Sequence, residues 1–147
     1  PITVLRLFTV YGPYGRPDMA PYKFVKAAMS KHRINLHNKG NHFRDFTYID
    51  DVAETIVKVI KKKPRKHFQI YNVCSSNIVS LKYFVKLIEK ILGIRFKKKF
   101  LKKQEGDVYK TYGCNKKLIK DFLKNYKFTK IDEGMRKFIE WYRSFYV

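Results

Sequence analysis

Two short segments of the chain hold the polar residues best suited to binding a ligand. The segment from Phe8 to Met19 contains Thr9 and Arg16 among glycines and prolines, and such a constrained backbone presents a polar side chain with little entropy loss on binding. The segment from Phe43 to Asp51 sets Arg44 among aromatic residues. A partly desolvated guanidinium there can bind a diphosphate through paired N–H groups. A salt bridge between Arg44 and a nearby aspartate explains the residue equally well, and both interpretations stay open.

The sequence lacks the motifs that would carry redox or metal chemistry. It contains no Gly-x-x-Gly-x-x-Gly or Gly-x-Gly-x-x-Gly turn, which would seat the pyrophosphate of a dinucleotide. The four histidines and two cysteines are scattered without metal-ligand spacing. Three Tyr-x-x-x-Lys pairs occur, as chance predicts for so many tyrosines and lysines: Tyr22/Lys26, Tyr112/Lys116 and Tyr126/Lys130. We therefore predict no catalytic residue and no metal site in this chain.

The two polar segments need a framework of strands and helices to position them. The apolar, β-branched run from Ile2 to Tyr11 predicts a buried parallel strand. A helix is expected from about Pro21 to His32. Phe43 to Ile49 is expected to be extended, and Asp50 and Asp51 to cap a following helix. The other expected elements are strands over 34–37, 68–73 and 96–101, a helix capped by Ser80 and stopped by Gly93, and helices over 116–123 and 132–145.

Length and composition bound the class of protein. The chain has 147 residues, of which 45% are hydrophobic, and this is enough for one α/β domain with a real core. No run approaches 18 apolar residues, so we predict no membrane span. The first residues carry no initiator Met and no signal-peptide pattern, so the chain is expected to be the interior of a longer one. The two thiols, Cys74 and Cys114, favour a reducing, cytoplasmic setting.

The formal net charge of +21 raises the question of nucleic-acid binding. Lysine outnumbers arginine 25 to 8, however, and the lysines are spread along the chain, whereas specific phosphate and base contacts favour arginine. We predict no specific nucleic-acid partner. A noncatalytic basic binding module remains the alternative from another functional class, and the steep salt dependence of its binding would reveal it.

Two motifs give the sequence a family resemblance. Residues 6–20, Arg-Leu-Phe-Thr-Val-Tyr-Gly-Pro-Tyr-Gly-Arg-Pro-Asp-Met-Ala, and residues 43–52, Phe-Arg-Asp-Phe-Thr-Tyr-Ile-Asp-Asp-Val, resemble the NAD-dependent epimerase/dehydratase family of extended short-chain dehydrogenases/reductases. They are most similar to its UDP-glucuronate 4-epimerases. Shorter matches follow in the same order at 71–73, 79–81, 104–108 and 134–142, so the resemblance spans essentially the whole chain.

The resemblance implies roles for particular side chains. Thr9 and Arg16 would contact the glucuronate end of the substrate, Arg44 with His42 beside it would hold the UDP diphosphate, and Asp107 would accept hydrogen bonds from ribose hydroxyls. Gln104 would stand where some relatives carry a second diphosphate-binding arginine. The strand over 34–37 would flank the uracil.

The resemblance also implies an architecture. The first strand would be the last strand of a Rossmann-like sheet, and the remainder would form the small α/β substrate-binding lobe. Residues 1–147 would then be a single carboxyl-terminal domain of an epimerase that converts UDP-glucuronate to UDP-galacturonate, with the amino-terminal domain that binds NAD absent. The chain alone would be inactive, and the full-length enzyme would be a homodimer. UDP-glucose or another nucleotide sugar is the alternative substrate.

Overall fold

The chain folds as interleaved strands and helices, the α/β class that the sequence predicts. The structure, a computed structural model, describes residues 1–64 and 66–146. The strands are β1 (Ile2–Leu7), β2 (Thr9–Tyr11), β3 (Ile34–His37), β4 (Phe43–Tyr48), β5 (Phe68–Val73), β6 (Ile78–Ser80) and β7 (Lys98–Leu101). The helices are α1 (Ala20–Met29), the single 3₁₀ turn η1 (Asn38–Gly40), α2 (Ile49–Ile60), α3 (Leu81–Leu92), α4 (Lys116–Asp121) and α5 (Ile131–Tyr146).

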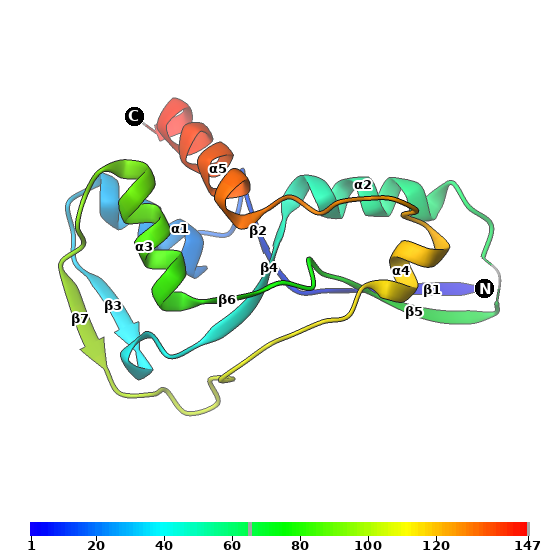
Figure 1. Cartoon of the computed structure of the whole chain (residues 1–147), viewed down its shortest axis with the longest axis horizontal. Helices are drawn as coiled ribbons and strands as arrows, with labels where there is room; N and C mark the ends of the chain where they lie inside the picture. Colours follow the sequence, from blue (N-terminus) through cyan, green and yellow to red (C-terminus); the bar gives the residue numbers. More distant parts are fainter. Residues whose placement is uncertain (65, 147) are drawn as a thin grey trace.

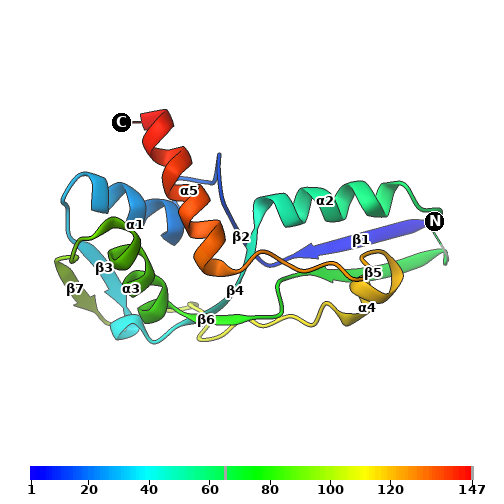
Figure 2. The same ribbon diagram turned by 45° about the horizontal axis from the view of Figure 1, so that its top comes forward.

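These elements form two groups at opposite ends of the long axis (Figure 1). One end holds α2, β1, β5 and α4, and the other holds α1, α3, β3 and β7, with β4 running between them. Figure 2 shows the same separation after a 45° turn, with α2 lying along β1. The site described below is built where β4 reaches the second group.

Each end has its own hydrophobic core. The larger core joins α1, β4, α3 and α5 through aromatic side chains such as Phe46 and Phe84, whose rings stack 4.7 Å apart. The smaller core joins α2, β5 and α4 through Val52, Val73 and Leu118. The chain passes from the larger core to the smaller one at the junction of β4 and α2, since Tyr48 belongs to the first core and Val52 to the second.

In the part of the chain that the structure describes, the strands pair in three small sheets. β1 pairs with β5 in parallel, β3 pairs with β7 in parallel, and β4 is flanked by parallel β2 and antiparallel β6. The predicted single strand from Ile2 to Tyr11 is therefore two strands that belong to different sheets. The break falls at Phe8, whose backbone N–H donates to the carbonyl of Val73.

The prediction that this first strand is buried was wrong. None of the six residues of β1 is buried, and Ile2 and Leu7 are 60% and 51% exposed. The reason is that β1 pairs only with β5 within the described residues, so its other edge carries no strand. Periodicity marks a strand as apolar but does not show how many neighbours cover it.

Local signals predicted several helix ends correctly. The Ser80 hydroxyl accepts a hydrogen bond from the Tyr83 N–H at the start of α3, and Gly93 ends that helix in the left-handed conformation. The first helix ends at Met29, three residues before the expected His32. Capping by Asp50 and Asp51 was also wrong, because Tyr48 occupies the cap position and both aspartates lie in the first turn.

Candidate functional site

A cavity of about 630 Å³ opens where β2, β4 and the start of α1 meet β3. This volume lies within the range of roughly 300–1,000 Å³ that is typical of small-molecule sites. Five of the six predicted binding residues lie on its wall: Thr9, His42, Arg44, Gln104 and Asp107. The rest of the lining comes mainly from α1 and β3: Asp18, Met19, Ala20, Pro21, Lys23, Phe24, Ala27, Arg33, Ile34, Asn35, His37, Phe46 and Leu81.

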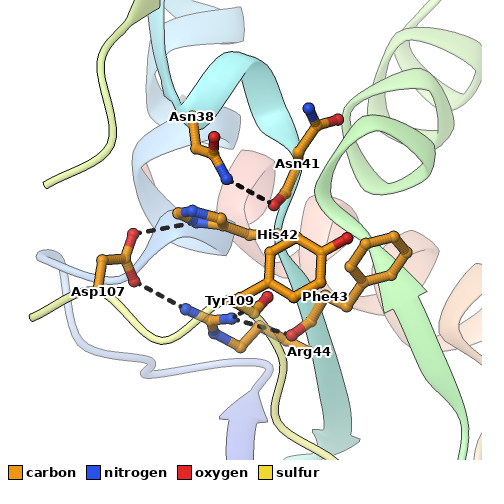
Figure 3. Close-up of polar contacts among 7 residues, drawn as sticks. All are labelled: Asn38, Asn41, His42, Phe43, Arg44, Asp107 and Tyr109. Carbon is orange, nitrogen blue, oxygen red and sulfur yellow. Dashed lines mark hydrogen bonds and ion pairs between the residues drawn. The ribbon is translucent and has the colours of Figure 1, made fainter.

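Arg44, His42 and Asp107 form the polar centre of this cavity (Figure 3). The Nη2 group of Arg44 donates to Oδ1 of Asp107 over 2.9 Å, and Nδ1 of His42 lies 3.0 Å from the other carboxylate oxygen. The sequence left two interpretations of Arg44 open, and the aspartate pairing is present: the partner is Asp107, which is 63 residues away. The diphosphate interpretation is compatible with it, as the remaining donors show.

The guanidinium of Arg44 is also fixed from behind by the backbone. Its Nη1 group donates to the carbonyl oxygens of Phe43 at 2.9 Å and Tyr109 at 3.4 Å. A guanidinium carries five N–H groups. The hydrogen bonds within the described part of the chain occupy three of them, which leaves the Nε–H and one Nη2–H for a ligand. Arg44 is thus held in one orientation with two donors to spare.

The segment from Gln104 to Thr111 brings Asp107 to β4. The Phe43 N–H donates to the Tyr109 carbonyl, and the Thr111 N–H donates to the Phe43 carbonyl, so this segment runs alongside the start of β4. The segment begins with a turn, in which the Asp107 N–H donates to the Gln104 carbonyl and Gly106 has a φ of +75°. Gln104 and Asp107 therefore approach the cavity from the same turn.

His42 is only 5% exposed and precedes Arg44 by two residues, so both side chains project from the same side of the strand. Its Nδ1 atom faces Asp107, and a carboxylate there can only accept a hydrogen bond. Its other nitrogen, Nε2, is buried and has no hydrogen-bond partner among the described residues. His42 thus belongs to the cavity wall, and the described residues do not use the hydrogen-bonding capacity of its Nε2 atom.

Arg16 is the predicted residue that the structure does not bring to the cavity wall. Its side chain is exposed and binds the Asp18 carboxylate with two hydrogen bonds of 3.0 and 2.6 Å. Hydrogen bonding to this guanidinium lowers the pKa of the Asp18 carboxyl. Asp18 itself lines the cavity, so the Asp18 side chain separates Arg16 from the cavity wall. Thr9 reaches the wall through β2, where it pairs with Phe46.

Sequence reasoning missed two cationic residues of the lining, Lys23 and Arg33. Lys23 shares one face of α1 with Ala20 and Ala27, and this spacing could have shown that the helix lines a site. Arg33 directly precedes β3 and had no distinguishing local signal. Asn35 and His37 of the strand expected to flank a uracil both lie on the wall.

Two of the three tyrosines at Tyr-x-x-x-Lys spacing have structural partners, and the third, Tyr112, is 55% exposed. The Tyr126 hydroxyl donates to buried Asp51 over 2.8 Å, and burial together with this bond raises the pKa of Tyr126. A catalytic base requires the opposite shift. Tyr22 packs against Tyr142 and other aromatic rings of α5.

Comparison of the sequence with known proteins shows which family the chain is similar to. Residues 1–74, half of the chain, match the model of the NAD dependent epimerase/dehydratase family. The chain is 40% identical to Protein CapI of Staphylococcus aureus and 35% identical to a probable UDP-glucuronate 4-epimerase of Rhizobium meliloti. Each of these two matches covers 99% of this chain and 48% of the relative. The chain thus spans about half the length of the curated relatives it matches.

The fold matches that of a solved epimerase. UDP-glucuronic acid 4-epimerase from Bacillus cereus, in complex with UDP-glucuronic acid and NAD, superposes with a TM-score of 0.92 at 29% identity. The match covers 99% of this chain and 46% of that one. The predicted fold class is confirmed: an α/β part of an extended short-chain dehydrogenase/reductase.

Proposed function

Because the chain belongs to the NAD dependent epimerase/dehydratase family, we propose that it is the nucleotide-sugar-binding part of a 4-epimerase. The proposed substrate is UDP-glucuronate, which the complete enzyme interconverts with UDP-galacturonate. The observation that carries this proposal is the cavity in which Arg44, held from behind, keeps two N–H donors for a ligand. Guanidinium N–H groups suit the oxygens of a diphosphate.

Each wall residue has a proposed role that suits its chemistry. Arg44 binds the diphosphate, with the buried His42 beside it, and Asp107 accepts from ribose hydroxyls. Asn35 and His37 flank the uracil, and Gln104 contacts the diphosphate as a neutral donor. Thr9 donates to the glucuronate end. Arg16 reaches that end only when it releases Asp18, so we propose that the substrate carboxylate replaces Asp18 as its partner.

NAD is the cofactor of this family, and a glycine-rich strand–helix turn is the motif that binds its pyrophosphate. None of the described strand–helix junctions carries a Gly-x-x-Gly-x-x-Gly or Gly-x-Gly-x-x-Gly turn. We propose that NAD is bound mainly by an amino-terminal domain outside residues 1–147, which also holds the catalytic Tyr and Lys. The cofactor accepts and returns the hydride, whereas this chain binds and orients the sugar nucleotide.

A binding measurement tests the proposal directly. Isothermal titration should show that the chain binds UDP and UDP-glucuronate, and that R44A loses at least tenfold in affinity for both. R143A is the matched control, because it removes the same charge from an exposed site on α5 and should bind like the unmodified chain. Equal affinities in R44A and R143A would refute the diphosphate site.

Substrate choice and activity need separate tests. R16A should lower the preference for UDP-glucuronate over UDP-glucose and leave UDP binding unchanged, since the arginine is assigned only to the carboxylate. An unchanged preference would move the assignment to UDP-glucose or another nucleotide sugar. The chain incubated alone with UDP-glucuronate and NAD should give no UDP-galacturonate, and product formation would contradict the assignment of catalysis to another domain.

A further inference from the structure

Arg44 and His42, which we propose bind the diphosphate, already face the negatively charged carboxylate of Asp107. Both oxygens of Asp107 are engaged, one by Arg44 and the other by His42 (Figure 3). The carboxylate and the guanidinium are each about three-quarters buried, so solvent screens their charges only in part. In the absence of a ligand, the cationic centre of the site is therefore largely neutralised.

This arrangement penalises any anion that binds to Arg44. An anion on the two spare N–H groups would lie within a few ångströms of the Asp107 carboxylate, because Nη2 bonds that carboxylate over 2.9 Å. Two like charges at such a distance, partly shielded from water, repel each other strongly. Charge alone is thus a poor basis for affinity at this site, although the cavity also contains Lys23 and Arg33.

The repulsion of anions by Asp107 affects selectivity in a protein with such a high positive charge. A net charge of +21 attracts every anion in solution, including inorganic phosphate and pyrophosphate. A carboxylate at the centre of the site repels these small anions, but it also accepts hydrogen bonds from hydroxyl groups. A nucleoside diphosphate carries hydroxyls on its ribose, and inorganic anions have no comparable neutral donors. The nucleotide can offset the repulsion with hydrogen bonds from neutral hydroxyls, whereas the P–OH group of a hydrogen phosphate anion donates only by bringing its own negative charge next to the carboxylate.

We propose that Asp107 is a selectivity residue that excludes inorganic phosphate anions from the Arg44 site and admits nucleoside diphosphates. The inference rests on the proposed function for its nucleotide ligand, and it adds a role that ribose binding alone does not contain. Ribose binding predicts weaker nucleotide affinity when Asp107 is neutralised. Selectivity predicts, in addition, tighter binding of pyrophosphate.

The experiment compares three ligands on the unmodified chain and on D107N, which keeps the size of the side chain and removes its charge. Titration at one fixed low ionic strength should show pyrophosphate binding about tenfold tighter to D107N, which corresponds to about 1.4 kcal/mol. Uridine, which has ribose but no charge, should bind about tenfold more weakly. The preference for UDP over pyrophosphate should fall at least tenfold. D107S repeats the charge removal without an amide.

E105Q is the matched control, since it removes one negative charge from an exposed position in the same turn that is not on the cavity wall. Its pyrophosphate affinity should stay within about twofold of the unmodified chain. Unchanged or weaker pyrophosphate binding in D107N, with UDP still bound by the unmodified chain, would overturn the selectivity role alone. An unmodified chain that binds no UDP would instead refute the proposed function, on which this role rests.

Discussion

Gly134 marks the place where α5 presses most closely on the strand that carries Thr9. A Cβ atom added at Gly134 would overlap the hydroxyl of Tyr11, and it would lie 2.8 Å from Cζ of that ring and 2.9 Å from Cδ2 of Tyr48. These rings are buried, at 3% exposure each, and Tyr11 ends β2 two residues after Thr9. The helix can pack here only because residue 134 has no side chain.

The size of the effect of G134A follows from two opposing contributions. Alanine is the better helix former and would add about 1 kcal/mol to the stability of α5. Overpacking a well-filled core costs about 1–3 kcal/mol, and three close approaches to rigid rings argue for the upper end. We expect G134A to lose about 2 kcal/mol of unfolding free energy, which corresponds to a Tm lower by about 4–8 °C in a chain of this size.

Urea unfolding followed by Trp141 fluorescence measures this loss, because the single tryptophan lies in α5. S144A is the comparison on the same helix: Ser144 is exposed, and alanine there gains helix propensity but loses the hydrogen bond from the Ser144 hydroxyl to the Trp141 carbonyl. The Tyr11 hydroxyl has no partner among the described residues, so Y11F should change stability by less than about 1 kcal/mol. In the double variant it should recover about 1 kcal/mol of the G134A loss. A G134A variant as stable as S144A would refute the close packing.

Two buried aspartates give further predictions. D51A should lose about 3 kcal/mol in urea unfolding, because the carboxylate accepts from Tyr126 and twice from Thr129 and is 2% exposed. The exposed neighbour supplies the control D50A, with a loss below about 1 kcal/mol, and equal losses would contradict the reasoning. Burial raises the pKa of Asp45 above its ordinary 3.8, so its contribution to stability is present below about pH 4 and is lost as the pH rises through the folded-state pKa. The stability of D45N relative to the unmodified chain should therefore increase between pH 4 and pH 7, and a constant difference would exclude ionisation of Asp45 as the cause.

The elements that sequence predicted well are those with local causes. The hydroxyl of Ser80 caps the third N–H after it, and Gly93 adopts the left-handed conformation that ends a helix, so each signal lies within a few residues of its effect. Five of the six predicted binding residues also converge on one cavity, and their roles in binding stay predictions.

What escaped prediction depends on contacts between distant parts of the chain. Asp51 was expected to cap a helix, but it binds Thr129, which is 78 residues away. Arg44 and Asp107 were both predicted as site residues, yet their mutual bond requires the segment around Tyr109 to run along β4. A periodic pattern of apolar residues cannot predict contacts between segments that are distant in the sequence, because it reflects only the local environment of each residue.

The open edge of β1 has a consequence for the behaviour of the chain in solution. Unpaired N–H and C=O groups along an apolar strand form a template on which a second strand can add, and Ile2 and Leu7 are exposed beside them. Mutual repulsion between molecules that each carry +21 charges opposes such contacts. Added salt shortens the range of that repulsion to a few ångströms and leaves the strand edge unchanged. We therefore expect residues 1–147 on their own to associate more readily as salt is added, and light scattering would measure this.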